Sequence, residues 1–183
     1  TGTDNVDLAA CRERGIVVSN IRNYSLVSVP EHVFTLILAL RRNLMAYSAD
    51  VAAGLWQAQD RFCLLGHPIG DLAGSRIGIV GYGALGHKVA HLARAFGMEV
   101  CAAARSSVDD PGVTVLPLPE LLRTSDVISL HLPLNDKTRN MIGAAELATM
   151  KRTALLINTA RGGLVDEAAL ADATGLIHAT PTG

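Results

Sequence analysis

Three glycines in the middle of the chain, Gly81, Gly83 and Gly86, stand at the spacing G-x-G-x-x-G. Glycines at this spacing can hold a diphosphate. The first makes a tight turn, the second lets the main chain approach the phosphates, and the third lets a helix pack close to a sheet. The N–H groups and the positive dipole end of such a helix would then face the anion. The spacing alone is weak evidence, since the same glycines often form only a flexible loop.

The residues on either side of the glycines supply the context that this motif requires. Residues 76–80 are mostly apolar and predict a buried strand. After the glycines, apolar side chains at helical spacing predict an amphipathic helix that ends near Gly97: Leu85, Val89, Leu92, Ala93 and Phe96. A strand, a glycine turn and a helix in this order predict a dinucleotide-binding site.

The end of the next strand bears on which dinucleotide would bind. In such sites a carboxylate usually ends the second strand, about 20 residues on, and binds the ribose. Here Ala104 occupies that place, and Arg105, Ser106 and Ser107 follow it. An arginine with hydroxyl groups can hold a 2′-phosphate, so we expect NADP to be preferred over NAD. The alternative is that Arg105 is a solvated surface charge and that the site takes NAD.

Two further polar residues follow apolar strands. Arg161 stands on a glycine loop after the strand that ends at Asn158, and its planar guanidinium could clamp the carboxylate of a small acid. By spacing alone, a structural arginine tied to a backbone carbonyl is the simpler interpretation. His131, at the end of its strand, is most simply a packed or hydrogen-bonded histidine.

The elements that must position these residues alternate between strands and helices. We predict strands at residues 16–18, 76–80, 98–103, 113–115, 127–132 and 154–158, and helices at residues 7–14, 84–96, 119–123, 144–150 and 166–173. A further helix begins at an S-x-x-E capping box at Ser28 and continues to about residue 53, ahead of a connecting loop over residues 54–75. Its first half is apolar nearly all round, so it should be buried between layers or at a subunit contact.

This alternation implies an α/β fold with a doubly wound parallel sheet of the Rossmann-like kind. Ligands of such sheets bind beyond the carboxyl ends of the strands. That rule selects four segments with polar or glycine residues just after apolar strands: 81–86, 104–107, 131–138 and 158–163. Their agreement is stronger evidence for one site than any single motif.

The composition excludes several classes of partner. The 183 residues carry a net charge of −1, so there is no basic field for nucleic acid. The longest apolar run, residues 33–40, is too short to span a membrane. Cys11, Cys63 and Cys101 lack C-x-x-C spacing, which favours free thiols in a reducing compartment and therefore a cytoplasmic location. No metal site is predicted.

Nearly the whole chain resembles the D-isomer-specific 2-hydroxyacid dehydrogenases. The stretches that carry the resemblance are T-G-T-D-N-V-D at residues 1–7, S-V-P-E-H at 28–32, G-I-V-G-Y-G-A-L-G at 78–86, H-L-P-L at 131–134 with Thr138, and N-T-A-R-G-G-L-V-D at 158–166. The last is the most specific. Residues 62–69 and the sequence around Gly81 look most like the glycerate dehydrogenase (hydroxypyruvate reductase) branch.

The resemblance implies hydride transfer between a nicotinamide and C2 of a small 2-oxo or 2-hydroxy acid such as hydroxypyruvate, glyoxylate or glycerate. It gives Arg161 the role of binding the substrate's carboxylate and oxo group. Separately, we expect the full-length protein to be a homodimer, with the apolar helix over residues 29–40 as the candidate contact. The resemblance also implies a set of cofactor contacts: Ala84 and Leu85 at the pyrophosphate, His131 and Pro133 on the adenine side with Thr138 nearby, and Thr159 and Ala160 near the nicotinamide.

The end of the chain departs from the family pattern. The resemblance implies a histidine acid/base oriented by a glutamate, but His178 does not follow a proline as the motif requires, and a sixth strand and glutamate-bearing loop are not predicted. We therefore expect the chain not to be a competent catalyst alone.

The expected division is residues 1–25 as a remnant of a substrate domain and hinge, 26–173 as the nucleotide-binding domain and 174–183 as an irregular tail. Two alternatives remain for the function: a non-catalytic nucleotide-sensing module, and an inactive truncated gene product. The retained Arg161 argues mildly for the enzyme, since a sensor has less need of a carboxylate clamp.

Overall fold

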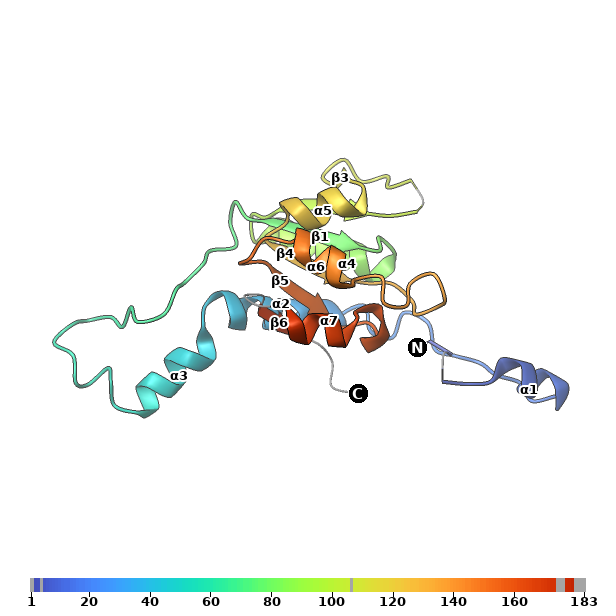
Figure 1. The fold of residues 1–183 in the computed structure, drawn as a ribbon, viewed down its shortest axis with the longest axis horizontal. Coiled ribbons are helices and arrows are strands. Elements are labelled where there is room, and N and C mark those ends of the chain that lie inside the picture. Colours follow the sequence, from blue (N-terminus) through green and yellow to red (C-terminus); the bar gives the residue numbers. More distant parts are fainter. Residues whose placement is uncertain (1, 4, 106, 174–176, 180–183) are drawn as a thin grey trace.

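A six-stranded parallel sheet forms the centre of the molecule (Figure 1). The computed structural model describes residues 2–3, 5–105, 107–173 and 177–179. The strand order is β3-β2-β1-β4-β5-β6, and every neighbouring pair is parallel. The order therefore reverses between β1 and β4, which confirms the predicted doubly wound sheet. The strands are β1 (Arg76–Val80), β2 (Glu99–Ala103), β3 (Thr114–Val115), β4 (Val127–Leu130), β5 (Leu155–Asn158) and β6 (Ile177–Ala179).

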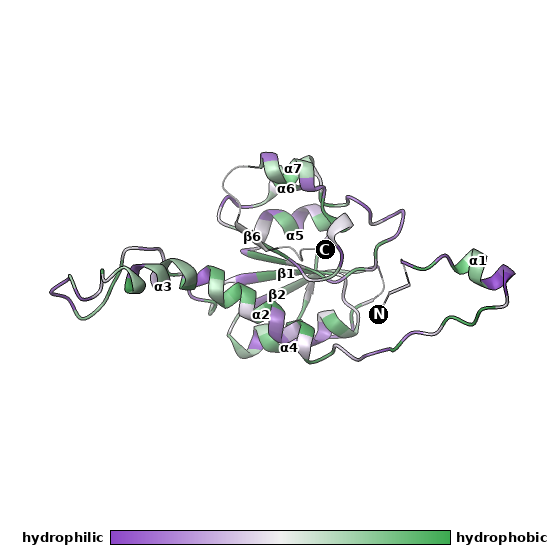
Figure 2. Cartoon of the chain, turned by 90° about the horizontal axis from the view of Figure 1, so that it is seen from below, coloured by the Kyte–Doolittle hydropathy of each residue, from purple (hydrophilic) through white to green (hydrophobic). Residues whose placement is uncertain are grey.

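Helices cover both faces of this sheet (Figure 2). α2 (Ser28–Arg41) and α4 (Ala84–Ala95) lie on one face. α5 (Leu118–Thr124), α6 (Ala144–Thr149) and α7 (Glu167–Asp172) lie on the other. α1 (Leu8–Glu13) and α3 (Leu44–Ala52) extend away from the sheet at opposite ends of the molecule. A short 3-10 turn, η1 (Gly162–Leu164), precedes α7.

Alternation along the strands divides the apolar residues between two cores. Ile77 and Ile79 of β1 pack with α2 and α4, whereas Val80 packs with α5, α6 and α7. In β5, Leu155 and Ile157 join the first core and Leu156 the second. Because successive side chains point to opposite faces, strands buried on both sides must be apolar throughout. This explains why the strands could be recognised from short apolar runs.

The predicted strand at residues 16–18 and the predicted capping box are both wrong. Residues 16–18 are irregular, and Val17 is 91% exposed. β propensity alone does not make a strand where no neighbouring strand pairs with it. Ser28 is the first residue of α2 and does not cap it, since the N-cap is Val27 and no side chain bonds to the end of the helix.

The predicted helix from residue 28 to about 53 is interrupted. α2 ends at Arg41, and Asn43 adopts the left-handed conformation with φ of 48° before α3 begins. The side-chain amide of Asn43 donates a hydrogen bond to the carbonyl of Pro68 in the connecting loop. The break thus depends on a contact 25 residues away, which no local pattern reveals.

The end of the chain contains a strand that the sequence did not predict. Ile177–Ala179 pairs in parallel with β5, with Ile177 opposite Leu155. The expectation of an irregular tail without a sixth strand is therefore wrong for these residues. A strand of three residues is too short for periodicity to predict, and pairing with β5 defines it. The proposed boundaries at residues 25 and 173 stay a prediction.

Two negative observations concern the described part of the chain. None of its helices is long and apolar enough to cross a membrane. Cys11, Cys63 and Cys101 are free thiols, as predicted. The cytoplasmic location that the cysteines suggest stays a prediction.

Candidate functional site

Gly81 makes a turn that no other residue could make without strain. Its φ is 97°, and a Cβ atom there would lie 2.6 Å from the carbonyl oxygen of His131. Its N–H donates to the carbonyl of Ala103 at 3.0 Å. The end of β1 is thus held between the ends of β4 and β2, and a glycine is required for both conformation and space.

The other two glycines lie at the start of α4. Gly83 is the N-cap residue, and no heavy atom lies within 4 Å of the place where its Cβ would stand. A Cβ on Gly86 would lie 2.5 Å from the carbonyl oxygen of Gly81, so the helix packs tightly onto the turn. No side chain caps this twelve-residue helix. Its first N–H groups, at Ala84 and Leu85, therefore offer a site for an anion.

A cleft of about 540 Å³ lies beside this turn, and we name it the glycine-loop cleft. Its walls come from the segments that follow β1, β2, β3 and β4. Arg105 and Lys137 line it, and none of the described lining residues is acidic. The surroundings of the cleft therefore suit a ligand with negative charge.

Thr138 supports the wall of this cleft with a hydroxyl that is already engaged. It is 2% exposed, and its Oγ1 donates to the carbonyl of Pro133 at 2.7 Å and accepts from the N–H of Asn135 at 2.9 Å. These bonds close the loop after β4. Thr138 thus lines the glycine-loop cleft, but its hydroxyl holds the loop that carries Pro133.

His131 lies where two cavities meet and is uncharged at neutral pH. Its Nε2 is 2.8 Å from Oγ of Ser129, which is fully buried in β4. Burial lowers the pKa of His131 to about 4. This geometry matches the simpler interpretation of a packed, hydrogen-bonded histidine.

A second cavity, of about 700 Å³, shares His131, Leu132 and Pro133 with the first, and we name it the Arg161 cavity. Thr159, Ala160 and Arg161 line it on one side, and Leu85 also contributes. The N-terminal segment closes it through residues that include Thr3, Tyr24 and Ser25.

Asn158 fixes the loop that carries Arg161. It is 1% exposed, its Nδ2 donates to the carbonyl of Arg161 at 2.8 Å, and its Oδ1 accepts from the N–H of Ala160 at 3.1 Å. Nη1 of Arg161 donates to the carbonyl of Ala160 at 2.8 Å, the kind of contact that the structural interpretation of this arginine expects. Arg161 nevertheless lies in the cavity wall. The hydroxyl of Thr159 is buried and has no hydrogen-bond partner among the described residues.

The structure thus gathers the four predicted segments at one edge of the sheet. The glycine-loop cleft takes Gly81, Gly83, Arg105, His131, Pro133 and Thr138, and the Arg161 cavity takes Leu85, His131, Pro133, Thr159, Ala160 and Arg161. Ala84 and Gly86 belong to the first turn of α4 between them. Ser106 lies outside the described residues.

Sequence reasoning missed several residues of this region. Tyr82 lines the cleft from within the glycine motif, where the pattern specifies no residue type. Leu116, Pro117 and Leu118 follow the strand predicted at residues 113–115, but they are apolar or proline and gave no polar or glycine signal after that strand. Asn158 stood in the predicted segment, and its position directly after an apolar strand was the signal that pointed to it.

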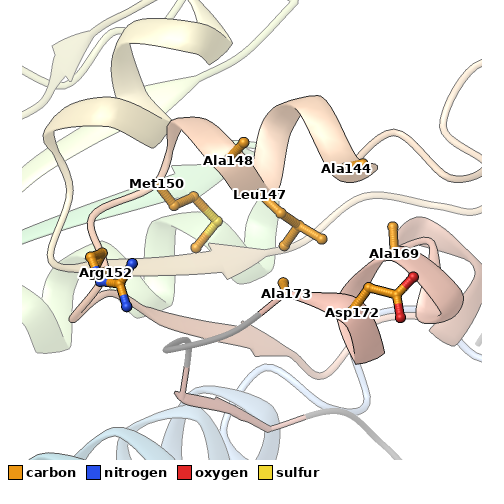
Figure 3. A pocket seen from close by; sticks show the side chains of 8 residues that line it. All are labelled: Ala144, Leu147, Ala148, Met150, Arg152, Ala169, Asp172 and Ala173. Atoms are coloured by element: carbon orange, nitrogen blue, oxygen red, sulfur yellow. The ribbon is translucent and has the colours of Figure 1, made fainter.

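Another cavity, of about 320 Å³, lies between α6 and α7 (Figure 3). Leu147, Met150 and Ala173 line it, with Arg152 and Asp172 at its rim. It shares no lining residue with the other two cavities and includes none of the residues with predicted chemistry. We assign it no part in the site.

Comparison with known families identifies the family to which this chain belongs. The model of the family described as "D-isomer specific 2-hydroxyacid dehydrogenase, NAD binding domain" matches residues 34–176, which include β1 to β5 and α4. The chain belongs to this family. The resemblance is therefore confirmed, and so is the Rossmann-like fold predicted from the alternation of strands and helices.

Individual proteins are similar to this chain over almost its entire length. A glycerate dehydrogenase of Methylorubrum extorquens is 53% identical over 94% of this chain, which spans 54% of that relative. A D-lactate dehydrogenase from Aquifex aeolicus, complexed with NAD and lactic acid, is 37% identical with a TM-score of 0.87, covering 99% of this chain and 55% of its own. An acyclic imino acid reductase in complex with NADPH and D-Arg is 31% identical with a TM-score of 0.81, covering 97% of this chain and 58% of its own.

The chain spans about half the length of the curated relatives that it matches. The family match establishes that this chain belongs to the dehydrogenase family and has its cofactor-binding fold. The acid substrate, the choice between the two nucleotides and the assembly are matters for proposal.

The lowered pKa of His131 predicts a pH dependence of stability. The unfolded histidine binds a proton near its ordinary pKa of 6.5, but the folded one does so only near 4. The free energy of unfolding should therefore fall as the pH falls from 6.5 to 4, by at most about 1.4 kcal/mol per pH unit from this group. We expect His131→Gln to lose less stability than the wild type over this range in urea titrations. His91→Gln, which changes an exposed histidine of α4, should keep the wild-type slope, and equal slopes for all three proteins would contradict the prediction.

Proposed function

We propose that this chain forms the cofactor-binding part of a reductase that acts on a small 2-oxo acid, such as hydroxypyruvate or glyoxylate, with NADPH as the preferred cofactor. The observation that carries the proposal is the adjacency of the two cavities. One adjoins an uncapped helix N-terminus and contains the cations Arg105 and Lys137, the other contains Arg161, and both share His131–Pro133 as a common wall. A ligand that extends from one to the other would meet phosphate-binding groups first and an acid-binding arginine last. The glycerate dehydrogenase relative favours this class of acid.

The residues present fit a nicotinamide nucleotide. The space above Gly83 and the start of α4 suit the pyrophosphate, which we assign to the N–H groups of Ala84 and Leu85. We place the adenine side near His131 and Pro133 and the nicotinamide near Thr159 and Ala160. The unpartnered hydroxyl of Thr159 supports this placement, since a buried hydroxyl without a hydrogen bond is costly unless a ligand supplies one.

The preference for NADPH follows from the charges at the ribose end. Ala104 stands where NAD-binding sites carry a carboxylate, and both Ala104 and Arg105 line the cleft. A 2′-phosphate would meet Arg105, with Lys137 in the same cleft, and no carboxylate among the described lining residues would repel it. Relatives with either nucleotide are known, so the family alone leaves this choice open.

Titration of the 183-residue chain with NADPH and with NADH tests the cofactor assignment. We expect NADPH to bind more tightly, and Arg105→Ala to weaken NADPH by about 10–100-fold while changing NADH by less than about twofold. Enhancement of the fluorescence of the reduced nucleotide would report binding. Arg123→Ala, an exposed arginine of α5, is the matched control and should leave both affinities unchanged. Tighter binding of NADH would refute the NADPH preference, and no binding of either nucleotide would refute the proposed function.

Arg161 is assigned to the carboxylate of the acid. Arg161 lies in the cavity wall on a loop held by Asn158, and a planar guanidinium can donate two parallel hydrogen bonds to a carboxylate. Bound NADPH would supply a hydride to C2 of the acid, and the alkoxide oxygen left on that carbon would then need a proton. Among the described residues lining this cavity the histidine is His131, which is neutral at pH 7 and therefore holds no proton to give as an imidazolium. We therefore propose that this chain binds the acid but does not turn it over alone.

Thermal shift measurements separate this proposal from a nucleotide-sensing module. With NADPH present, hydroxypyruvate should raise the melting temperature of the wild type, and Arg161→Lys should lose at least half of that rise while keeping the effect of NADPH. Lysine keeps the charge but loses the planar pair of donors. Arg123→Lys should behave as the wild type. A rise with NADPH alone, unaffected by any 2-oxo acid tested, would favour the sensor, and steady NADPH consumption by the purified chain would refute the absence of turnover.

We also propose that a second copy of the chain covers the arm formed by α3 and residues 54–75. This arm projects from the sheet (Figure 1) and carries several exposed large apolar side chains: Leu44, Met45, Val51, Leu55, Trp56, Phe62, Leu65 and Ile69. Phe62 is 92% exposed and Met45 is 76% exposed. Apolar surface of this extent on one extension is typical of a protein–protein contact.

Sedimentation velocity measures whether the arm mediates self-association. We expect a dimer for the wild type and a monomer for the double variant Met45→Lys, Phe62→Asp, because charges buried without partners would oppose association. Val17→Asp changes an equally exposed apolar residue at the opposite end of the molecule and should leave the dimer intact. A monomeric wild type at micromolar concentration, or a double variant that still dimerises, would contradict this assignment.

A further inference from the structure

The side chain of Tyr82 joins the glycine loop to the loop that follows β2. Tyr82 stands between Gly81 and Gly83, and its hydroxyl donates a hydrogen bond of 2.8 Å to Oδ2 of Asp110. Asp110 lies between β2 and β3, in the same connection as Arg105. Tyr82 and Arg105 both line the glycine-loop cleft. One hydrogen bond therefore connects the glycine loop to the loop that carries a cation of the cleft.

Asp110 is the acceptor on which this connection depends. Nη1 of Arg94, in the last turn of α4, lies 3.1 Å from each of its carboxylate oxygens, and the N–H of Gly112 donates to Oδ1 at 3.1 Å. The side chain of Asp110 is 16% exposed. The hydrogen bond from Tyr82, followed by those from Arg94 and Gly112, lowers the pKa of Asp110, so the carboxylate stays ionised at neutral pH.

Tyr82 is held in a fixed place from the other side. Its ring centroid lies 4.2 Å from that of His87 in the first turns of α4. Burial, together with the bond to Asp110, raises the pKa of Tyr82 to about 12. The phenol therefore remains protonated and remains a donor. Both partners keep the protonation states that the bond requires.

We propose that Tyr82, through Asp110, is a positioning residue for Arg105 and thereby helps the site to choose NADPH over NADH. This inference rests on the proposed function. The bond ties the connection between β2 and β3 to the glycine loop, so that less freedom is lost when Arg105 meets a 2′-phosphate. NADH carries no phosphate at this place and gains nothing from a fixed Arg105. The role of Tyr82 is therefore one of specificity, and its ring and backbone serve both nucleotides equally.

Removing the hydroxyl of Tyr82 tests whether this residue affects the binding of NADPH alone or of both nucleotides. Tyr82→Phe keeps the ring and should weaken NADPH by about fivefold, with less than about a twofold change for NADH, in fluorescence titrations of the 183-residue chain. Asp110→Asn keeps the shape of the acceptor but loses the charge that pairs with Arg94, and it should shift the ratio of the two affinities in the same direction. Tyr47→Phe is the matched control, because that hydroxyl donates to the carbonyl of His67 in the arm. It should change neither affinity.

A double variant tests whether Tyr82 acts through Arg105. In an Arg105→Ala background, Tyr82→Phe should have no further effect on NADPH, and multiplied losses would overturn the proposal. An equal loss for NADPH and NADH would also overturn it. A wild type that binds neither nucleotide would instead refute the proposed function. A wild type that prefers NADPH through Arg105, with the ratio unchanged in both Tyr82→Phe and Asp110→Asn, would refute the positioning role alone.

Discussion

The close approach of the end of β1 to the start of the loop after β4 sets the geometry of the whole site. At Gly81 the backbone turns with φ of 97°, and the carbonyl of His131 stands where a Cβ would be. The strand order reverses between these two strands, so the connections leave toward opposite sides and a crevice opens between them. The uncapped start of α4, the glycine-loop cleft and the shared wall at His131–Pro133 all follow from this one contact. Any side chain at residue 81 would push β4 away from β1.

Charge is distributed around this crevice in a way that suits an anionic ligand. The positive end of α4, Arg105 and Lys137 lie on the side of the first cavity, and Arg161 lies on the side of the second. Between them His131 is neutral, because burial lowers its pKa to about 4 and Ser129 provides a hydrogen bond. Asp110 accepts hydrogen bonds from Tyr82 and from Arg94, so its charge is already paired. Cationic groups thus line each of the two cavities, and the uncharged imidazole of His131 lies in the wall that they share.

The residues that were predicted correctly are those whose requirement is local. The roles of Gly81 and Gly86 follow from conformation and close packing within one strand–turn–helix unit, and both are seen in the structure. Apart from the capping box at Ser28, the predictions that failed depend on partners distant in the sequence. The segment at residues 16–18 has β propensity but no neighbouring strand, whereas Ile177–Ala179 has little local signal but pairs with β5. Asn43 lies between α2 and α3, and its side-chain amide donates a hydrogen bond to the carbonyl of Pro68.

The sequence by itself determined the alternation of buried strands and helices, the glycine turn and the edge of the sheet at which polar residues would gather. These features follow from the periodicity of side chains and from the lack of a Cβ in glycine, which act over a few residues. Only the tertiary structure decided that the hydroxyl of Thr138 closes its own loop, that His131 is neutral and that Tyr82 bonds to Asp110. Burial and hydrogen-bond partners decide those properties, and both depend on segments that only the folded chain brings together.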